Sequence, residues 1–241
     1  MQDQLIASIE KMIPNGKRLE LPRDDHFSNY AQVKKALLTA GGKYKKNGFE
    51  FTEEAAEIKA RLVGGELVND KKKFQFFATP PELADRLVEL AYLDSGHDVL
   101  EPSAGQGAIS NIIQGKVNSL VTVELMPQNV QALIRQGYNP LEADFLTLAP
   151  EDIGYFDRIV ANPPFTKNQD IDHIKHMFTF LKPEGWIITL ASKSWITGSQ
   201  KKQVSFREWL DDMGATVTDI PAGAFKTSGT NISSVIIEIT K

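Results

Sequence analysis

Four consecutive residues that follow an apolar run at 158–161 have the types needed to hold a planar amine: Asn162, Pro163, Pro164 and Phe165. The asparagine offers a carbonyl oxygen to amine hydrogens, and the phenylalanine offers a flat apolar face. The two prolines fix the turn and remove two backbone N–H donors, which favours a site rich in acceptors. An amine whose hydrogens are both accepted keeps its lone pair free to attack an electrophile. The alternative is a rigid loop with a turn-forming asparagine and a core phenylalanine.

A glycine-containing segment lies between an apolar run at 97–100 and a second one at 108–113. It consists of Glu101, Pro102, Ser103, Ala104, Gly105, Gln106 and Gly107. Glycine lets the backbone pass close to a bound ligand because it has no Cβ. The spacing is not that of the dinucleotide fingerprint and no Walker lysine follows, so dinucleotide and triphosphate sites are weaker interpretations. The alternative is an ordinary glycine turn between a strand and a helix.

Two acidic residues close further apolar segments. Glu124, which is followed by Leu125, ends the run at 120–123 and could accept both hydrogens of a ribose diol. Asp144 could accept from the exocyclic amine of an adenine, while the ring of Phe145 packs on the adenine face. The alternative for Glu124 is a solvated carboxylate at a strand end. For Asp144 it is a solvated loop carboxylate beside a core phenylalanine, Phe145.

Two later segments follow expected strands and could line the same site. Phe225 lies in the segment 221–225 and could stack on a base, although a core position is the alternative. Lys193 and Trp195 come just after the expected strand 186–191, and we interpret them as candidate substrate contacts. Tryptophan in such a place is more often a packing residue.

These motifs need a sheet that brings its strand ends together. Short apolar runs at 97–100, 120–123, 158–161, 186–191, 215–220 and 232–239 alternate with helical patterns, including 127–136 and 205–213. Such alternation predicts an α/β domain over residues 71–241 with a mostly parallel sheet covered by helices on both faces. Ligands of such sheets bind beyond the carboxyl ends of the strands, where all the motifs above occur.

Residues 1–70 have a different pattern and predict a small α+β appendage. A helix is expected over 29–39, a hairpin around Asn47 and Gly48, and a helix from a Thr52 cap to about Val63. A unit of this size and content should bury little core by itself and should dock on the rest of the chain. Lysines at 34–46 and 71–73 either contact a phosphate backbone or form a solvated surface.

The composition excludes several classes of protein. The chain has 241 residues, no cysteine and a formal net charge of −4. A disulfide framework and a thiolate metal site are therefore ruled out, and no apolar run approaches the roughly 20 residues needed to span a bilayer. We expect no metal, since His173 and His176 lack a third ligand at a recognisable spacing. A cytoplasmic protein that does not contact membranes is the expectation.

The motif order over residues 74–241 resembles that of the class I adenine-N6 methyltransferases of the gamma group, whose cofactor is S-adenosyl-L-methionine. The resemblance implies a Rossmann-like seven-stranded sheet. It also implies that Phe77 to Pro81, including Thr79 and Pro80, border the methionine part of the cofactor. By the same resemblance, the segment 101–107 and Glu124 with Leu125 contact the cofactor, and Asp144 with Phe145 contacts its adenine.

In that family a tetrapeptide like Asn162 to Phe165 holds the target amine, and a later phenylalanine, here Phe225, stacks on the flipped base. The resemblance therefore implies methylation of adenine N6 in nucleic acid, with DNA favoured as the partner. In that family a large recognition domain usually follows the segment that matches 74–241. Residues 1–70, an inserted loop or a partner subunit would then read the DNA sequence, and the expected partners are a separate specificity subunit or a second copy in a homodimer. RNA base methylation at adenine N6 or guanine N2, protein glutamine methylation, and a non-catalytic partner subunit remain alternatives.

Overall fold

The computed structural model describes residues 2–22, 27–64, 78–220 and 233–241, which belong to two compact units, Met1–Lys73 and Phe74–Lys241. Each unit has its own sheet and its own buried core. Among the described residues, no helix has both the length and the apolar character that crossing a membrane requires.

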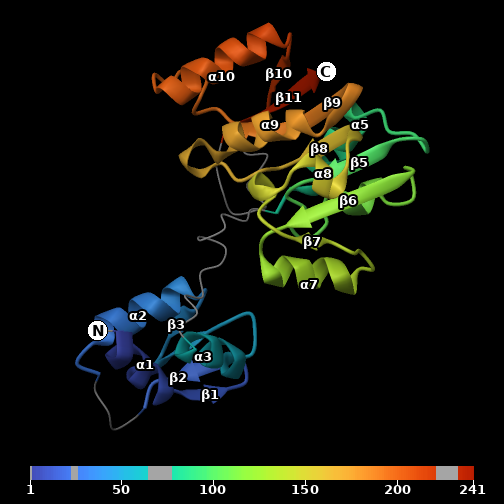
Figure 1. Ribbon diagram of the computed structural model, residues 1–241. Helices are drawn as coiled ribbons and strands as arrows, with labels where there is room; N and C mark the ends of the chain where they lie inside the picture. Colours follow the sequence, from blue (N-terminus) through green and yellow to red (C-terminus); the bar gives the residue numbers. More distant parts are fainter. Residues whose placement is uncertain (1, 23–26, 65–77, 221–232) are drawn as a thin grey trace. The chain divides into compact units, whose positions relative to one another are not determined.

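The larger unit is built on a seven-stranded sheet in the order β10-β11-β9-β8-β5-β6-β7 (Figure 1). In chain order the strands are β5 (Asp98–Glu101), β6 (Ser119–Glu124), β7 (Leu141–Glu142), β8 (Phe156–Ala161), β9 (Leu181–Ser192), β10 (Thr216–Asp219) and β11 (Ser234–Thr240). Strands β5 to β9 pair in parallel, and β11 runs antiparallel to both β9 and β10. This arrangement confirms the expected mostly parallel α/β fold.

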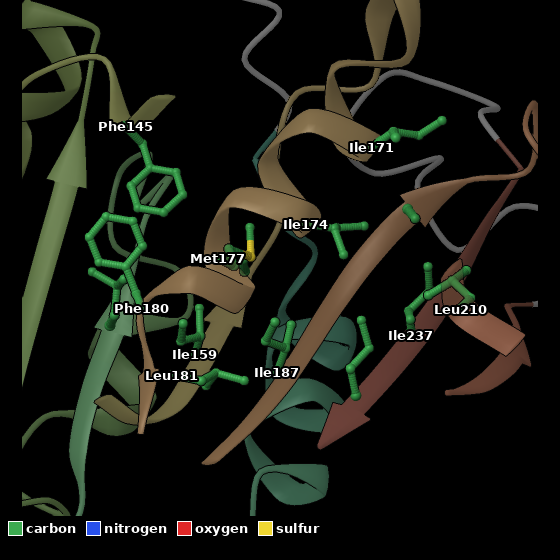
Figure 2. Close-up of a cluster of buried hydrophobic side chains, with 14 of the residues drawn as sticks. Phe145, Ile159, Ile171, Ile174, Met177, Phe180, Leu181, Ile187, Leu210 and Ile237 are labelled. Atoms are coloured by element: carbon green, nitrogen blue, oxygen red, sulfur yellow. The ribbon is translucent and has the colours of Figure 1, made fainter. Parts of the chain in front are cut away.

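Helices cover both faces of this sheet, because its central strands are apolar on both sides. Ile159 and Ile187 pack into one buried cluster with residues of α9 and α10, whereas their neighbours Val160 and Ile188 pack into another with α5 and α6. Figure 2 shows the first cluster, with the side chains of α9 lying against β9. The helices are α5 (Pro81–Leu90), α6 (Ser110–Ile113), α7 (Pro127–Arg135), α8 (Pro150–Ile153), α9 (Gln169–Thr179) and α10 (Lys201–Asp212). Two 3-10 helices, η1 (Phe145–Thr147) and η2 (Thr166–Asn168), precede α8 and α9.

The sequence pattern located most of these elements but missed β7. That strand has only two residues, Leu141 and Glu142, and both are exposed. Neither an apolar run nor an alternation marks it, because it is a short edge strand that pairs only with the end of β6. Helix α5 begins as expected, with Pro81 in its first turn, where a missing N–H leaves no helical bond unmade.

The smaller unit contains, in its described residues 2–22 and 27–64, a four-stranded antiparallel sheet in the order β1-β2-β4-β3 and three helices. Its elements are α1 (Gln2–Glu10), β1 (Ile13–Asn15), β2 (Arg18–Glu20), α2 (Tyr30–Thr39), β3 (Lys43–Lys45), β4 (Gly48–Glu50) and α3 (Ala55–Val63). The expected hairpin at 47–48 joins β3 to β4, but the β1–β2 hairpin was not predicted.

Two expectations about this unit were wrong. Helix α3 begins at Ala55, with Glu54 rather than Thr52 at its N-cap position and no capping side chain. The unit also buries a substantial core of its own, because the unpredicted β1–β2 hairpin adds Leu19 beside Phe49 and Leu37. A helix and a hairpin alone would not have enclosed these side chains.

Candidate functional site

The carboxyl ends of the parallel strands place the predicted motifs at one edge of the larger sheet. Glu101 ends β5, Glu124 ends β6, and Asn162 directly follows β8. Strand β5 pairs in parallel with both β6 and β8, so these three residues share an edge. Asp144 follows β7, the neighbour of β6, at the same edge.

Glu124 organises the glycine-containing segment. The N–H of Gly105 donates to its Oε2 at 2.7 Å, and the N–H of Met126 donates to its Oε1 at 2.6 Å. Burial raises the pKa of Glu124, while these backbone donors act in the opposite direction. The side chain is 7% exposed. The carboxylate therefore holds the segment in place while keeping a small accessible surface.

The backbone conformation explains why glycine occurs in this segment. Gly105 has φ +57° and Gly107 has φ +87°, values in the left-handed region that glycine adopts without a Cβ clash. The N–H of Ala104 also donates to the carbonyl of Val123 on β6 at 3.0 Å. Pro102 and Ala104 are buried, and Ser103 is half-buried. The adjacent Leu125 is one of the exposed large apolar side chains.

Glu101 is a buried carboxyl group with a strongly altered acidity. It is 1% exposed, and the hydroxyl of Ser110 on α6 donates to its Oε2. Burial raises the pKa of Glu101 to about 8, and the neighbouring charge of Glu124 contributes in the same direction. The side chain is therefore largely protonated at neutral pH, so a cation brought next to it would favour the ionised form.

Asp144 and Phe145 have different environments. Asp144 is exposed, and its Oδ1 accepts from the N–H of Leu146 at 3.0 Å, which caps η1. Phe145 is 2% exposed, with its ring centroid 4.9 Å from that of His176 and 5.1 Å from that of Phe180 (Figure 2). The expected stacking of Phe145 on a ligand is corrected: its ring is a core element and has little surface to offer.

The Asn162 side chain joins two motifs that lie far apart in the sequence. Its Nδ2 donates to the Oγ1 of Thr79 at 3.0 Å, just before α5. Thr79 is half-buried and Pro80 is buried. Pro163 is buried as well, whereas Phe165 is partly buried against the α5 and α6 cluster. The bond orients the amide by turning its donor end towards Thr79.

The later candidates are Lys193 and Trp195, which follow β9 at the same edge, and Phe225. The Lys193 ammonium pairs with Asp219 at 2.9 Å. Trp195 is 4% exposed and packs edge-on against Phe206 at 5.1 Å, so its assignment as a substrate contact is corrected to a core role. Phe225 lies outside the described residues.

Sequence reasoning missed a polar cluster that anchors the segment after Asn162. Asn168 begins α9 with φ +57°, and its Oδ1 accepts from the Ser194 hydroxyl at 2.9 Å and from Nε2 of Gln203 at 3.3 Å. These bonds connect the loop after β8 to the loop after β9 and to α10. Asparagine tolerates the left-handed region well, which is the one local signal that marked it.

Two buried ionisable groups lie on α9. Asp170 is fully buried, and the N–H of Ser192 donates to its Oδ2 at 2.8 Å, which ties α9 to the end of β9. Burial raises the pKa of Asp170 and lowers that of His173 to about 4. Across the described parts of the chain, no group of acidic and histidine side chains is arranged to hold a metal ion.

No family model matches the sequence, and no curated protein sequence matches it. Solved structures do match. The methyltransferase subunit of a type I restriction-modification system from Streptococcus thermophilus superposes with a TM-score of 0.60 and 18% identity, over 75% of this chain and 49% of that chain. The type I restriction enzyme EcoKI M protein superposes with a TM-score of 0.57 and 14% identity, over 98% of this chain and 56% of that chain.

A putative RNA methyltransferase from Pyrococcus horikoshii gives a TM-score of 0.52 and 18% identity, over 72% of this chain and 88% of that chain. The chain thus spans about half the length of the two type I subunits. At these identities the likeness establishes the fold. The chain has the fold of the class I S-adenosylmethionine-dependent methyltransferases, and it is similar in structure to type I modification subunits.

Proposed function

We propose that the chain transfers a methyl group from S-adenosyl-L-methionine to the N6 amine of adenine in DNA. The observation that carries the proposal is the Asn162–Thr79 hydrogen bond at the edge of the sheet where Glu124 holds the glycine-containing segment. An amide suited to amine recognition and a loop suited to a nucleoside ligand lie at adjoining strand ends. The fold and its structural neighbours support methyl transfer.

The residues at this edge fit the chemistry of the cofactor. Glu124 is an acceptor suited to ribose hydroxyls, and Glu101 is a buried carboxyl group that a cation would ionise. S-adenosylmethionine carries a ribose, an ammonium and a sulfonium. The residues we expect to hold it are Thr79, Pro80, Glu101, Pro102, Ser103, Ala104, Gly105, Gly107, Glu124, Leu125 and Asp144.

We assign the positioning of the target base to Asn162, Pro163 and Phe165. The Asn162 amide and the Pro163 carbonyl accept the two N6 hydrogens, and Phe165, with Phe225, stacks on a base taken out of the duplex. The bound cofactor supplies an electrophilic methyl group on a positively charged sulfur. With the cofactor bound, its methyl group would pass from the sulfur to the N6 nitrogen that Asn162 and Pro163 hold, and N6 would then release one proton to solvent. Positioning and electrostatics account for the catalysis.

A separate subunit or a second copy of the chain would supply sequence recognition. Two of the structural neighbours are themselves subunits of type I restriction enzymes, which supports this proposal. Light scattering of the purified chain, with and without a DNA duplex, distinguishes a monomer from a homodimer.

The direct test of the function is to incubate the chain with methyl-labelled S-adenosylmethionine and separate pools of DNA, RNA and protein. Nucleoside analysis of the labelled pool should give N6-methyladenine from DNA. Label found in RNA alone, as N6-methyladenine or N2-methylguanine, would show that RNA rather than DNA is the substrate. No label in any pool, together with no cofactor binding by calorimetry, would indicate a non-catalytic partner subunit.

The Asn162→Ala substitution tests the assigned role of the amide. Transfer should fall by at least about a hundredfold, because the variant loses the group that orients the amine, while the affinity for S-adenosylmethionine stays within about threefold. Single-turnover rates and calorimetry give the two values. The control is Asn139→Ala, which removes an exposed loop asparagine of the same domain. Near-normal turnover by Asn162→Ala would refute the assignment.

A further inference from the structure

The two units of the chain carry opposite net charge. Residues 1–73 contain fourteen Lys and Arg against eleven Asp and Glu, whereas residues 74–241 contain thirteen against twenty. Nucleic acids are densely negative, and proteins bind their backbone mainly through cations. Residues 1–73 are therefore the part of the chain with a surplus of cations over acidic residues.

Five of the fourteen cations of residues 1–73 belong to one stretch of the chain. Residues 27–49 contain five lysines and no acidic residue. These lysines lie on α2, on β3 and in the turn after β3, and all five are exposed: Lys34, Lys35, Lys43, Lys45 and Lys46. Strand β3 is an outer strand of the four-stranded sheet. We use the name β3 ridge for Lys34, Lys43, Tyr44, Lys45 and Lys46.

The β3 ridge combines cations with an exposed aromatic ring. Tyr44 is 46% exposed, and the Lys34 ammonium lies 5.4 Å from its ring centroid. Lys43 and Lys45 flank Tyr44 on the strand, so their side chains point to the opposite face. Cations thus lie on both faces of β3. An exposed ring next to lysines is the combination that binds sugar–phosphate backbones and unstacked bases.

One acidic residue of the neighbouring strand, Glu50 on β4, lies opposite Lys43, and the hydrogen bond from Lys45 and the charge of Lys43 lower its pKa. Lys45 pairs with Glu50 at 2.6 Å. In the parts of the chain that the structure describes, Lys34, Lys43 and Lys46 make no ion pair. The acidic side chains 53, 54 and 57 belong to α3 and its start, and α3 packs on β1 and β2 at the other side of the sheet. Apart from Glu50, these acidic side chains therefore belong to the side of the sheet away from β3.

We propose that the β3 ridge binds the phosphodiester backbone of the nucleic acid on which the larger unit acts. The inference rests on the proposed function for the identity of that substrate as DNA. What the inference adds is the binding surface. Lysines at the edge of the smaller sheet neutralise phosphates, and Tyr44 contacts a sugar or base.

The test uses the full chain and a fluorescent 30-base-pair duplex, with affinity measured by anisotropy over a range of NaCl concentrations. The variant is Lys43→Gln with Lys46→Gln, and the matched control is Lys17→Gln with Lys116→Gln, which removes the same charge from exposed lysines elsewhere. Each phosphate neutralised contributes about 0.9 to the slope of log affinity against log salt. The ridge variant should reduce that slope by about 1.8, and the control should retain the wild-type slope.

The proposal would be overturned by an unchanged slope in the ridge variant with an unchanged melting temperature, by an equal loss of slope in the control, or by no binding of DNA or RNA to the wild-type chain. Parallel measurements use single-stranded DNA and RNA of the same length. Loss of binding to any of them in the ridge variant alone supports the proposal and identifies the strand. Preferential binding of the wild-type chain to phosphatidylserine vesicles would also overturn it.

The outcomes separate this proposal from the function itself. If the ridge binds DNA but no pool is methylated, the proposed function is wrong and the proposal for the β3 ridge still stands. If the ridge variant methylates DNA normally with an unchanged KM for DNA, the proposal for the β3 ridge is wrong and the proposed function still stands.

Discussion

Glu101 shows how a single buried carboxyl group links folding to ligand binding. Its folded pKa of about 8 lies above the ordinary value of 4.5, because burial disfavours the charged form more than the hydrogen bond from Ser110 favours it. The folded chain therefore retains a proton that the unfolded chain has lost. As pH rises from about 4.5 to 8, the unfolded state binds fewer protons, and stability decreases through that window.

Replacing Glu101 by Gln should remove this pH dependence. The amide keeps an acceptor for Ser110 and avoids burying a charge, so at pH 9 the variant should be more stable than the wild type by several kcal/mol, on the order of 3. Urea unfolding at pH 5, 7 and 9 measures the difference, which should shrink towards pH 5. A variant that is uniformly less stable would contradict the stated acidity.

The same substitution has a ligand-binding counterpart. A cationic ligand beside Glu101 favours its ionised form, so the affinity for S-adenosylmethionine should rise between pH 6 and 8 in the wild type more than in Glu101→Gln. The ionisable groups of S-adenosylmethionine titrate equally in both measurements, so the variant serves as the control for their effect on affinity. Equal pH profiles would place the carboxyl group away from the ligand's charges.

At the scale of elements, the strand ends opposite the candidate site are joined by an ion network. The Lys182 ammonium at the start of β9 donates to Asp98 on β5 at 2.7 Å and to Asp157 on β8 at 2.9 Å. Hydrogen bonds from Lys182, Ser119 and Asn118 lower the pKa of Asp98 to about 2. One lysine thus joins three strands at the edge where no ligand is expected.

Lys182→Met should lower the free energy of unfolding by about 1–2 kcal/mol at pH 7, because two carboxylates lose their shared donor. The contribution of Asp98 is present above its ordinary pKa of 3.8 and is lost as pH falls towards 2, so the two proteins should converge near pH 2. Chemical unfolding from pH 2 to 8 measures this. Lys116→Met is the control, and a deficit independent of pH would contradict the prediction.

The elements also show which features can be predicted from sequence. Strands β5, β6, β8 and β9 contain apolar runs that are buried towards their carboxyl ends, so the apolar pattern located them and their motif-bearing ends. Strand β7 and the β1–β2 hairpin are short and largely exposed, and they depend on a neighbouring strand that local pattern does not show. Their existence is a tertiary effect.

The candidate site was predictable only where side chains carry a motif. The positions of Glu124 and Asn162 followed from strand ends, but the burial of Phe145 and Trp195 did not, because an aromatic residue beside a polar one suits both a core and a ligand contact. The roles of Asn168 and Asp170 depend on partners more than twenty residues away in the sequence. No spacing rule marks such contacts.

At the scale of the whole molecule, the chain contains two units with separate cores. The core of the smaller unit includes Leu19, Leu37 and Phe49, and the larger unit has clusters on both faces of its sheet. We propose that the two units fold independently. A domain of about 70 residues buries enough surface to fold alone, although with a small margin.

The isolated segment 1–73 should therefore unfold cooperatively on heating, and the segment 74–241 should bind S-adenosylmethionine within about threefold of the full chain's affinity. Thermal melts followed by circular dichroism, together with calorimetry on the fragment, measure both. If segment 1–73 is unstructured alone while the full chain melts in one transition, the units depend on each other and the proposal is wrong.

The two hydrogen bonds that Glu124 accepts from Gly105 and Met126 have an evolutionary consequence. Because this glutamate holds its loop without any ligand, selection for folding alone is enough to conserve it. Asn162, whose proposed role is to position an amine, is conserved only while that chemistry is needed. Among descendants of this chain that have lost the activity, we therefore expect Asn162 to be substituted first, while Glu124 is still retained.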